Sequence, residues 1–390
     1  MSKKLVIKKF GGSSLSSVEK ISKIALRLSK KKDKNCDIVV VVSAMGNATD
    51  ELFNLAYQIS KNPSQRELDM LLTAGERISM SLLSLALQKY GLQSISFTGS
   101  QSGVITDTSH GNARIIDVKA FRIRKELEKN KIVIVAGFQG VSIKKEVTTL
   151  GRGGSDTSAV ALAAYLNADN CQIYTDVDSI YSADPRIIKD AAKLTRISYE
   201  NMLEMALSGA RVIHPRAVDF AKKYGIKLEI KSSFKDYEGT IVENRKYKEN
   251  NIIAVTGEEF LILLRIKGLT QINEFYNWLT NDNIDFYDYF HIDDMLYIVL
   301  KESELKKIKM MKTFNDEIKK ERVSSVVPVG DRLADNTKMI KKIFKTLNSE
   351  KIIPKMSSYF PNSIKIYIER EDFENALNLI HDEFIIKKEV

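Results

Sequence analysis

Over the first 245 residues, short runs of apolar residues alternate with longer segments of helical periodicity. The apolar runs are rich in β-branched residues and several end in Gly, Ser, Thr or Asp, which is typical of buried strands. The predicted strands cover residues 5–10, 37–44, 94–99, 131–140, 171–176 and 227–233. Predicted helices lie between them at residues 18–30, 65–89, 113–129, 156–166 and 199–207. This order predicts an α/β domain at residues 1–245, with a largely parallel sheet between helix layers.

A polar and charged segment near residues 237–251 has the composition of a linker. Two shorter units follow it, and both approximate the βαββαβ plan of an α+β ferredoxin-like domain. Their predicted strands cover residues 260–266, 284–290, 295–301, 324–330, 352–360, 363–369 and 384–389. One predicted helix opens after Gly268. Three others cover residues 302–321, 337–347 and 372–382. We place the two units at residues 251–322 and 323–390, as a weak internal repeat.

Composition narrows the class of protein. The 44% of hydrophobic residues can form ordinary cores, which excludes wholesale disorder. The longest purely aliphatic run, residues 38–42, is far shorter than the roughly 18 to 20 residues that span a bilayer. Glycines at positions 11 and 12 interrupt the place where a signal peptide has its apolar core. We therefore expect a cytoplasmic protein that does not insert into a membrane.

The charge and the cysteines exclude further classes. The 60 Lys and Arg against 50 Asp and Glu give a net charge of +10, spread along the chain without interleaved aromatic residues. This spacing argues against nucleic-acid binding and leaves a mild bias toward small anions. Cys36 and Cys171 form no CxxC pair, so we expect core thiols rather than a disulfide or a zinc site.

Two glycine-rich turns follow predicted strands and lead into helices. In KFGGSS, residues 9–14, paired glycines and Lys9 fit an anion cradle at a helix N-terminus, although such a pair is more often only a tight turn. In GRGGSD, residues 151–156, Arg152 suits a carboxylate ligand, because a guanidinium donates two parallel hydrogen bonds. A helix cap at Asp156 with an incidental arginine is the alternative.

Two further segments carry acidic groups. YTDVDSIYSADPR, residues 174–186, offers Asp176, Asp178 and Asp184 for a hydrated Mg²⁺ or a nucleotide, and Tyr181 and Arg186 for a base and a phosphate. An acidic surface loop is equally plausible from this segment alone.

In TAGERIS, residues 73–79, Glu76 lies in an apolar helix and requires a partner if it is buried. Either a substrate ammonium or Arg77 meets that requirement. Ser43 and Thr49 offer hydroxyl donors for a small polar ligand, with turn or cap roles as the alternative.

Taken together, these glycine turns and charged side chains favour phosphoryl transfer as the reaction. The four histidines, at positions 110, 214, 291 and 381, have no metal-ligand spacing, and we expect structural roles for them. The remaining groups bind anions or position charge, and phosphoryl transfer requires little else from a protein.

Taken in order, the motifs resemble those of the aspartokinase family over nearly all of residues 5–242. They are KFGGSS, VVSAMGNATDEL, TAGERIS, TDTSHGNARI, GFQGV, the segment from TTLGRGGSD to LNAD, IYTDVDSIYSADPR, SGARVIHPRAV and KSSF. GRGGSD, YTDVD and SGARVIHPRA are much more specific than a single glycine turn. The resemblance implies an amino-acid kinase fold followed by two ACT domains. It also implies ATP-dependent phosphorylation of the side-chain carboxylate of L-aspartate to 4-phospho-L-aspartate, at the head of lysine, threonine and methionine synthesis.

The same resemblance assigns roles to individual residues. Lys9 would stabilise the transferring phosphoryl group and Asp156 would hold Lys9, while Mg²⁺ would be carried by ATP. Arg152 would bind the α-carboxylate of aspartate and Glu76 its ammonium. The aspartate pocket would be completed by Ser43, Thr49 and Ser155. The nucleotide site would include Lys9, Gly11, Gly12, Ser13, Thr175, Asp176, Tyr181, Asp184, Arg186 and Arg211.

The chain departs from the family in two places. Arg211 stands where the family usually has lysine, which keeps the positive charge. IDFYDYFHIDDML lacks a Thr-Ser-Glu stretch frequent at the family's effector pocket, and DNTKMI replaces Pro-Gly in the last unit. Feedback by lysine or threonine, alone or together, is what the family implies, and a desensitised or merely structural ACT pair is the alternative. The family also implies a homodimer or a dimer of dimers.

Three other functions compete with this interpretation. Another amino-acid kinase, acting for example on glutamate, would also use Arg152 and Glu76. A ligand sensor with an inactive kinase domain is a second, although Lys9, Asp156 and Asp176 are all retained. A nucleic-acid binder is the weakest, and it would require steeply salt-dependent binding.

Overall fold

The computed structural model describes residues 3–30, 33, 35–245, 251–268, 272–273, 275–276, 286–307 and 318–385. The chain forms two compact units. The first contains residues 1–180, 193–206 and 211–246, and the second contains residues 181–192, 207–210 and 247–390. Residues 181–192 and 207–210, which the sequence places in the N-terminal domain, therefore belong to the second unit.

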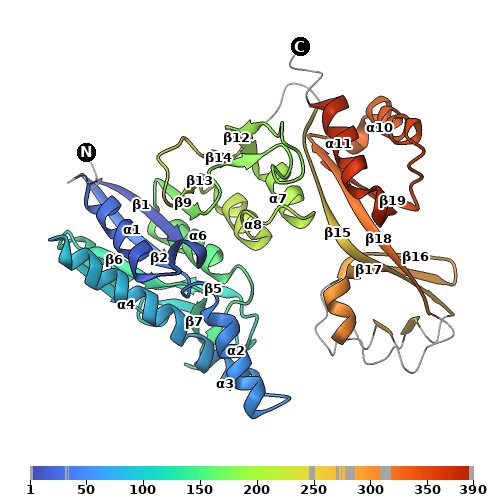
Figure 1. Ribbon diagram of the computed structural model, residues 1–390. Helices are drawn as coiled ribbons and strands as arrows, with labels where there is room; N and C mark the ends of the chain where they lie inside the picture. Colours follow the sequence, from blue (N-terminus) through green and yellow to red (C-terminus); the bar gives the residue numbers. More distant parts are fainter. Residues whose placement is uncertain are drawn as a thin grey trace. The chain divides into compact units, whose positions relative to one another are not determined.

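An eight-stranded sheet forms the centre of the first unit, in the order β12-β14-β13-β9-β1-β2-β6-β3 (Figure 1). Its central strands pair in parallel, and only β13 and β14 are antiparallel. The strands are β1 (Lys4–Phe10), β2 (Cys36–Val42), β3 (Ser94–Phe97), β6 (Ile132–Ala136), β9 (Asn170–Thr175), β12 (Arg196–Ser198), β13 (Leu228–Ser232) and β14 (Thr240–Glu243). The predicted parallel α/β domain is confirmed.

Helices cover both faces of this sheet. Apolar residues of α1 (Val18–Lys30) and α4 (Ala74–Lys89) pack with Phe10, Val40 and Ile134 in one buried cluster. Helix α6 (Gly154–Leu166) packs against β1, β2 and β9, and nearly all of its residues are buried. A helix that is buried on all sides packs closely through small residues, and α6 contains four alanines and two serines. Helices α7 (Tyr199–Leu207) and α8 (Pro215–Tyr224) precede β13.

A second, four-stranded sheet in the order β5-β4-β7-β8 corrects two predictions. Its strands are β4 (Val104–Thr106), β5 (Ile115–Val118), β7 (Gln139–Ser142) and β8 (Val147–Thr149). The predicted helix at 113–129 is wrong in its first half, because it contains β5 before α5 (Phe121–Leu127). The predicted strand at 131–140 is two strands of different sheets, separated at Phe138, whose φ of 66° interrupts an extended chain.

The predicted helix at 65–89 is also divided. It consists of α3 (Gln65–Leu72) and α4, which meet at Thr73. Together these form a helical stretch, Gln65–Lys89, that is long and apolar enough to cross a membrane, but half of its most apolar window is buried. A core helix has the same property, and α4 packs inside the first unit. Helix α2 (Ala48–Ile59) lies outside the predicted helices.

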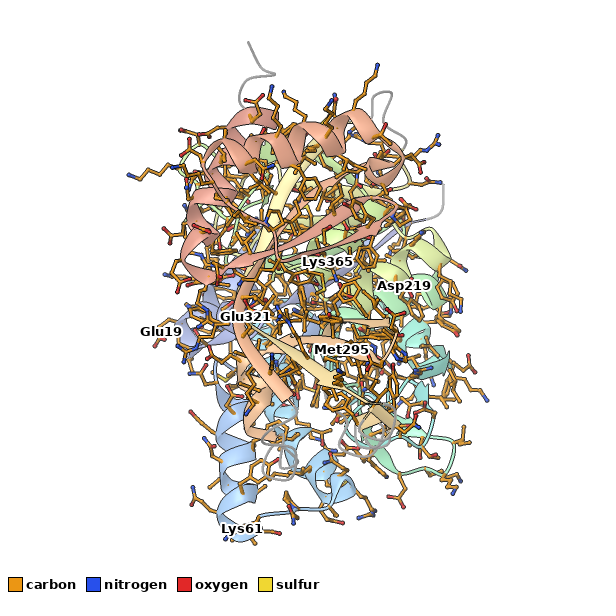
Figure 2. The ribbon with its side chains drawn as sticks, turned by 90° about the vertical axis from the view of Figure 1, so that its right-hand side faces the viewer. Glu19, Lys61, Asp219, Met295, Glu321 and Lys365 are labelled. Atoms are coloured by element: carbon orange, nitrogen blue, oxygen red, sulfur yellow. The ribbon has the colours of Figure 1, made fainter. Side chains whose placement is uncertain are left out.

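The second unit contains a six-stranded antiparallel sheet in the order β16-β17-β15-β18-β20-β19. The strands are β15 (Ile252–Lys267), β16 (Phe286–Ile292), β17 (Met295–Lys301), β18 (Ile318–Gly330), β19 (Met356–Phe360) and β20 (Ser363–Glu369). Glu321 of β18 and Lys365 of β20 are among the side chains shown in Figure 2. This antiparallel α+β region is consistent with the expected ACT domains.

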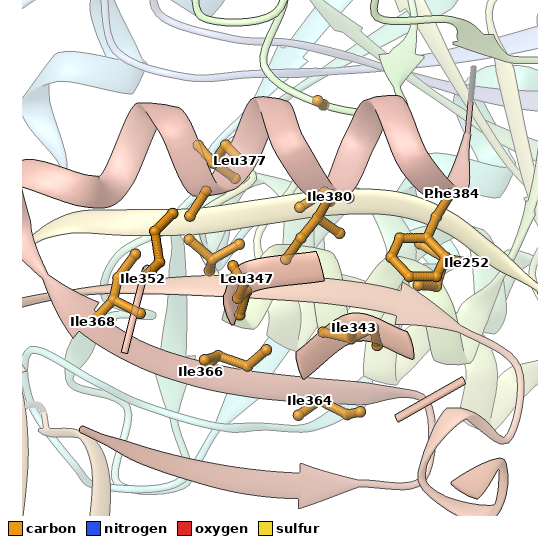
Figure 3. Close-up of a cluster of buried hydrophobic side chains, with 14 of the residues drawn as sticks. Ile252, Ile343, Leu347, Ile352, Ile364, Ile366, Ile368, Leu377, Ile380 and Phe384 are labelled. Atoms are coloured by element: carbon orange, nitrogen blue, oxygen red, sulfur yellow. The ribbon is translucent and has the colours of Figure 1, made fainter. Parts of the chain in front are cut away.

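Two large hydrophobic cores lie among the described residues of the second unit. In one, α10 (Thr337–Ser349) and α11 (Phe373–Phe384) pack against β18 and β20, and Figure 3 shows Ile343 and Ile380 among its side chains. In the other, Ile262 and Leu264 of β15 pack with Ile298 of β17. Strand β15 supplies both cores, since its residues 252 and 255 belong to the first.

Three predictions for this region change or lie outside the described residues. The predicted helix at 302–321 is a 3-10 helix at Glu302–Lys307, and β18 has already begun at Ile318. Residues 308–317 lie outside the described residues, as does most of the helix predicted after Gly268. Phe384 ends α11 rather than opening a strand, and residues 386–389 of that predicted strand are not described.

Candidate active site

A buried ion pair lies at the carboxyl end of β1, where a parallel sheet typically binds its ligand. Lys9 is the penultimate residue of β1, and Asp156 lies in the first turn of α6. The Lys9 Nζ atom is 2.6 Å from Asp156 Oδ1, and the side chains are only 12% and 10% exposed. Charges are costly to bury, so a pair at a strand end is better suited to positioning a ligand than to stability.

The turn after β1 brings the backbone close to the ammonium group of Lys9. The Gly11 N–H donates to the Tyr174 carbonyl of β9 at 3.3 Å, and a Cβ at Gly11 would lie 3.5 Å from Lys9 Nζ. At Gly12 a Cβ would lie 3.0 Å from the Ala44 carbonyl oxygen, which is tighter than ordinary contacts. Ser13, in the same turn, is exposed. Glycines here therefore let the turns after β1 and β2 approach each other.

Glu76 is a buried carboxylate at the start of α4. Its side chain is 3% exposed, and Oε1 accepts a hydrogen bond from the Ala44 N–H at 2.9 Å. Its other oxygen, Oε2, is buried without a hydrogen-bond partner. Loss of hydration raises the pKa of Glu76 to about 8. Within the described residues Arg77 forms no ion pair with it, so a ligand cation is the remaining candidate partner.

The other predicted aspartate-pocket residues lie on the surrounding loops and helices. Ser43 follows β2 and donates its N–H to the Phe10 carbonyl at 3.1 Å, while Thr49 is half-buried in α2. Ser155 is buried beside Gly137, where a Cβ would lie 2.9 Å from its Oγ. Arg152 is exposed on the loop between β8 and α6. These positions belong to neighbouring strand ends, but within the described part of the chain no hydrogen bond or ion pair joins the Arg152 side chain to the rest.

The end of β9 carries two of the predicted nucleotide residues, Thr175 and Asp176. Thr175 closes β9 and donates through Oγ1 to Asp176 Oδ1 at 2.9 Å. The Ser233 N–H donates to the Thr175 carbonyl at 2.9 Å, and Ser233 Oγ lies 2.5 Å from Ser14 Oγ. Hydrogen bonds thus join the turns after β1, β9 and β13. Arg211 is exposed in the loop that precedes α8.

Three predicted nucleotide residues, Tyr181, Asp184 and Arg186, belong to the second unit. There Arg186 Nη2 donates to Asp184 Oδ2 at 2.6 Å, and hydrogen bonds from Arg186 lower the pKa of that carboxyl. In the first unit, Asp178 pairs with Lys193 at 2.9 Å. Among the described residues, no three His, Cys, Asp or Glu side chains are grouped to hold a metal ion. The expected role of Asp176, Asp178 and Asp184 toward a hydrated Mg²⁺ or a nucleotide stays a prediction.

Sequence reasoning missed a polar cluster and a pair of residues near the site. Asp69 of α3 is fully buried and accepts from His110 Nδ1 at 2.7 Å and from the Gly111 N–H at 3.1 Å. His214 and Arg216, at the start of α8, contact the loop that carries Arg152. The His-Pro-Arg within SGARVIHPRA was the available signal, but backbone contacts of this kind cannot be inferred from side-chain types.

The geometry combines a buried ammonium beside a glycine turn with a buried carboxyl group that has one oxygen without a hydrogen-bond partner. The first arrangement suits a phosphate, and the second suits a ligand ammonium. No nucleophilic side chain is required for phosphoryl transfer between bound ligands, because positioning and charge stabilisation supply most of the catalysis.

Comparison with known proteins identifies the family. The model of the amino acid kinase family matches residues 4–232. Aspartokinase 2 of Bacillus subtilis (strain 168) is 42% identical over 401 residues, covering 98% of both chains. The structure of E. coli aspartokinase III with aspartate and ADP aligns with a TM-score of 0.81 at 23% identity, over 97% of this chain and 99% of that one. The structure of the same enzyme with lysine and aspartate aligns with a TM-score of 0.80 at 24% identity, over 98% and 99% of the two chains.

The structural likeness at these identities supports the fold, whereas the sequence identity along the whole chain establishes the relationship. The chain therefore belongs to the amino acid kinase family and, within it, to the aspartokinases.

Proposed function

We propose that the protein transfers the γ-phosphoryl group of Mg-ATP to the side-chain carboxylate of L-aspartate, giving 4-phospho-L-aspartate and ADP. The observation that carries this proposal is the buried Lys9–Asp156 ion pair beside the turn at Gly11 and Gly12. The chain's membership of the aspartokinases supports the choice of substrate, and E. coli aspartokinase III has been solved with aspartate and ADP.

Lys9 stabilises the phosphoryl group during transfer in this proposal. A cation about 4 Å from the developing charge contributes roughly 4 kcal/mol at an effective dielectric constant of about 20. Asp156 keeps the Lys9 ammonium in place, since the two charges are 2.6 Å apart. The turn of Gly11, Gly12 and Ser13 binds the ATP phosphates in this proposal, while the Gly11 N–H stays bonded to the Tyr174 carbonyl and anchors the turn.

The aspartate is held by its α-amino and α-carboxylate groups. The partnerless Oε2 of Glu76 accepts from the substrate ammonium, and Arg152 binds the α-carboxylate through two parallel hydrogen bonds. Ser43, Thr49 and Ser155 complete the pocket. The side-chain carboxylate of aspartate is already ionised at pH 7, so it attacks without a general base.

Thr175, Asp176 and Arg211 contact the nucleotide in this proposal. Arg211 keeps the positive charge of the lysine that is usual in the family, although its planar donors differ from an ammonium. The nucleotide roles of Tyr181, Asp184 and Arg186 rest on the sequence alone.

We further propose that residues 251–322 and 323–390 form two ACT domains that bind an amino-acid effector, lysine or threonine. Two hydrophobic cores in this region support two repeats, although residues 252 and 255 of β15 belong to the core of the second repeat. E. coli aspartokinase III has been solved with lysine, which supports an amino acid as the ligand class. The same proposal includes a cytoplasmic homodimer, or a dimer of dimers, that serves lysine, threonine and methionine synthesis.

ADP release by the purified chain with Mg-ATP and L-aspartate tests the function, with L-glutamate as the alternative acceptor. We expect turnover with aspartate only, and a loss of at least 100-fold in Lys9→Ala and Arg152→Ala. Lys23→Ala, an exposed lysine of α1, is the matched control and should retain full activity. Equal turnover with glutamate would indicate another amino-acid kinase, and binding of an amino acid without turnover would indicate a sensor.

A further inference from the structure

The beginning of α8 contacts the loop that connects β8 to α6 and carries Arg152. His214 precedes Pro215, the first residue of α8, and its ring lies directly over Gly153. A Cβ at Gly153 would lie 2.1 Å from His214 Cγ, and the φ of Gly153 is +67°. Both observations require glycine at this position, and the contact fixes the loop immediately after Arg152.

His214 also contacts the acidic partner of Lys9. Its backbone N–H donates to Asp156 Oδ2 at 3.3 Å, while Asp156 Oδ1 faces Lys9 Nζ at 2.6 Å. The ring of His214 is oriented in turn, because Nδ1 accepts from the Arg216 N–H at 3.3 Å as the N-cap of α8. One residue therefore contacts both ends of the segment from Gly153 to Asp156.

Arg216 holds the other side of the same loop. Its Nη1 atom donates to the Leu150 carbonyl at 2.8 Å and to Asn112 Oδ1 at 2.7 Å. Its Nη2 atom donates to the Ala113 carbonyl at 3.4 Å. The side chain is partly buried, and it forms no ion pair with a described carboxylate. All of these acceptors are neutral oxygens in two adjoining loops, so the guanidinium joins those loops.

We propose that His214 and Arg216 are positioning residues that hold the Arg152 loop, and with it Asp156, in the arrangement that binds and phosphorylates the substrate. Arg152 lies between two fixed points, Leu150 and Gly153, and its own side chain is exposed. The backbone therefore sets where the Arg152 guanidinium can reach. This inference rests on the proposed function, in which Arg152 binds the substrate α-carboxylate.

Steady-state kinetics of Arg216 variants test the inference. In Arg216→Ala we expect the KM for aspartate to rise 10- to 100-fold, with kcat reduced less than threefold and the KM for ATP unchanged. Asn112→Ala should also raise the KM for aspartate. The double variant should differ little from Arg216→Ala alone, because both substitutions remove the Arg216–Asn112 hydrogen bond. Arg216→Lys keeps one donor toward Leu150 and should recover part of the loss. Arg114→Ala, a neighbouring exposed arginine, is the matched control and should match the wild type.

A second measurement does not depend on turnover. Hydrogen exchange at the amides of residues 151–155 should be at least tenfold faster in Arg216→Ala than in the wild type or in Arg114→Ala. An unchanged KM for aspartate together with unchanged exchange would overturn the inference, as would an equal rise in both KM values. Wild-type inactivity with aspartate would refute the proposed function instead, and the exchange result would still decide whether Arg216 holds the loop. If Arg216→Ala does not fold, Arg216→Lys and Asn112→Ala give the same two readouts.

Discussion

Glu76 illustrates how one buried atom constrains ligand binding. A pKa of about 8 means that the carboxyl group is mostly protonated at neutral pH, and only deprotonated Glu76 attracts an ammonium. The same shift makes folding less favourable as the pH rises from 4.5 to about 8, because the folded chain retains a proton that the unfolded chain has released. Ligand binding and folding thus depend on the same proton.

From this follows a prediction about proton release. Because the substrate ammonium lowers the pKa of Glu76, aspartate binding at pH 6.5 should release about one proton, and the affinity should rise up to about tenfold per pH unit below pH 8. Titration calorimetry in two buffers of different ionisation enthalpy counts the proton. Glu76→Gln should bind more weakly and release none. If the wild type also releases none, the assignment of Glu76 to the ammonium is wrong.

At the scale of elements, the start of α4 packs against the turn that follows β2, and the two residues in contact, Gly75 and Ala44, have the smallest side chains. A Cβ at Gly75 would lie 2.8 Å from the Cβ of Ala44, whose N–H binds Glu76. Neither atom can rotate away, so added bulk must move the helix or the strand end. The position of Glu76 therefore depends on two small residues in separate elements.

Gly75→Ala should accordingly cost about 1–3 kcal/mol of folding free energy and weaken aspartate binding, because the helix start must shift. Ala44→Gly removes the opposing Cβ, so the double variant should recover most of both losses. Urea unfolding and aspartate titration of the single and double variants measure this. A double variant as impaired as Gly75→Ala would show that the close contact is not the cause.

The elements also show how much the sequence reveals. The helix α1, the strand-end motif at Lys9 and the burial of Glu76 in a helix were predictable, because periodicity and burial cost depend on residue type. The short strand β5 and the break at Phe138 were not, because pairing in the small sheet determines them rather than local propensity. The contacts of His214 with Gly153 and Asp156 arise from backbone geometry, which no side-chain pattern specifies.

At the scale of the whole chain, the second unit shows two repeats joined by shared strands. Alternate residues of β15 face different clusters, with Ile262 and Leu264 in one and Leu261 and Leu263 in another. The second of these clusters also contains Tyr367 of β20, beyond the shared strand β18. Asp288 of β16 accepts from the Tyr367 hydroxyl at 2.7 Å, which links the outer strand of one repeat to the other.

Shared strands predict cooperative unfolding of the second unit. Leu264→Ala removes a side chain from one core and Ile366→Ala from the other, and each should cost about 2–5 kcal/mol. Because β15 contributes to both cores and pairs with β18 along its length, we expect both variants to lower the midpoint of the same calorimetric transition rather than of two separate ones. Ile78→Ala, which truncates an exposed side chain of the first unit, is the control and should leave that transition in place. Two transitions that respond to one variant each would mean that the repeats fold independently, and that the shared strands do not pass the stabilisation by a ligand from one repeat to the other.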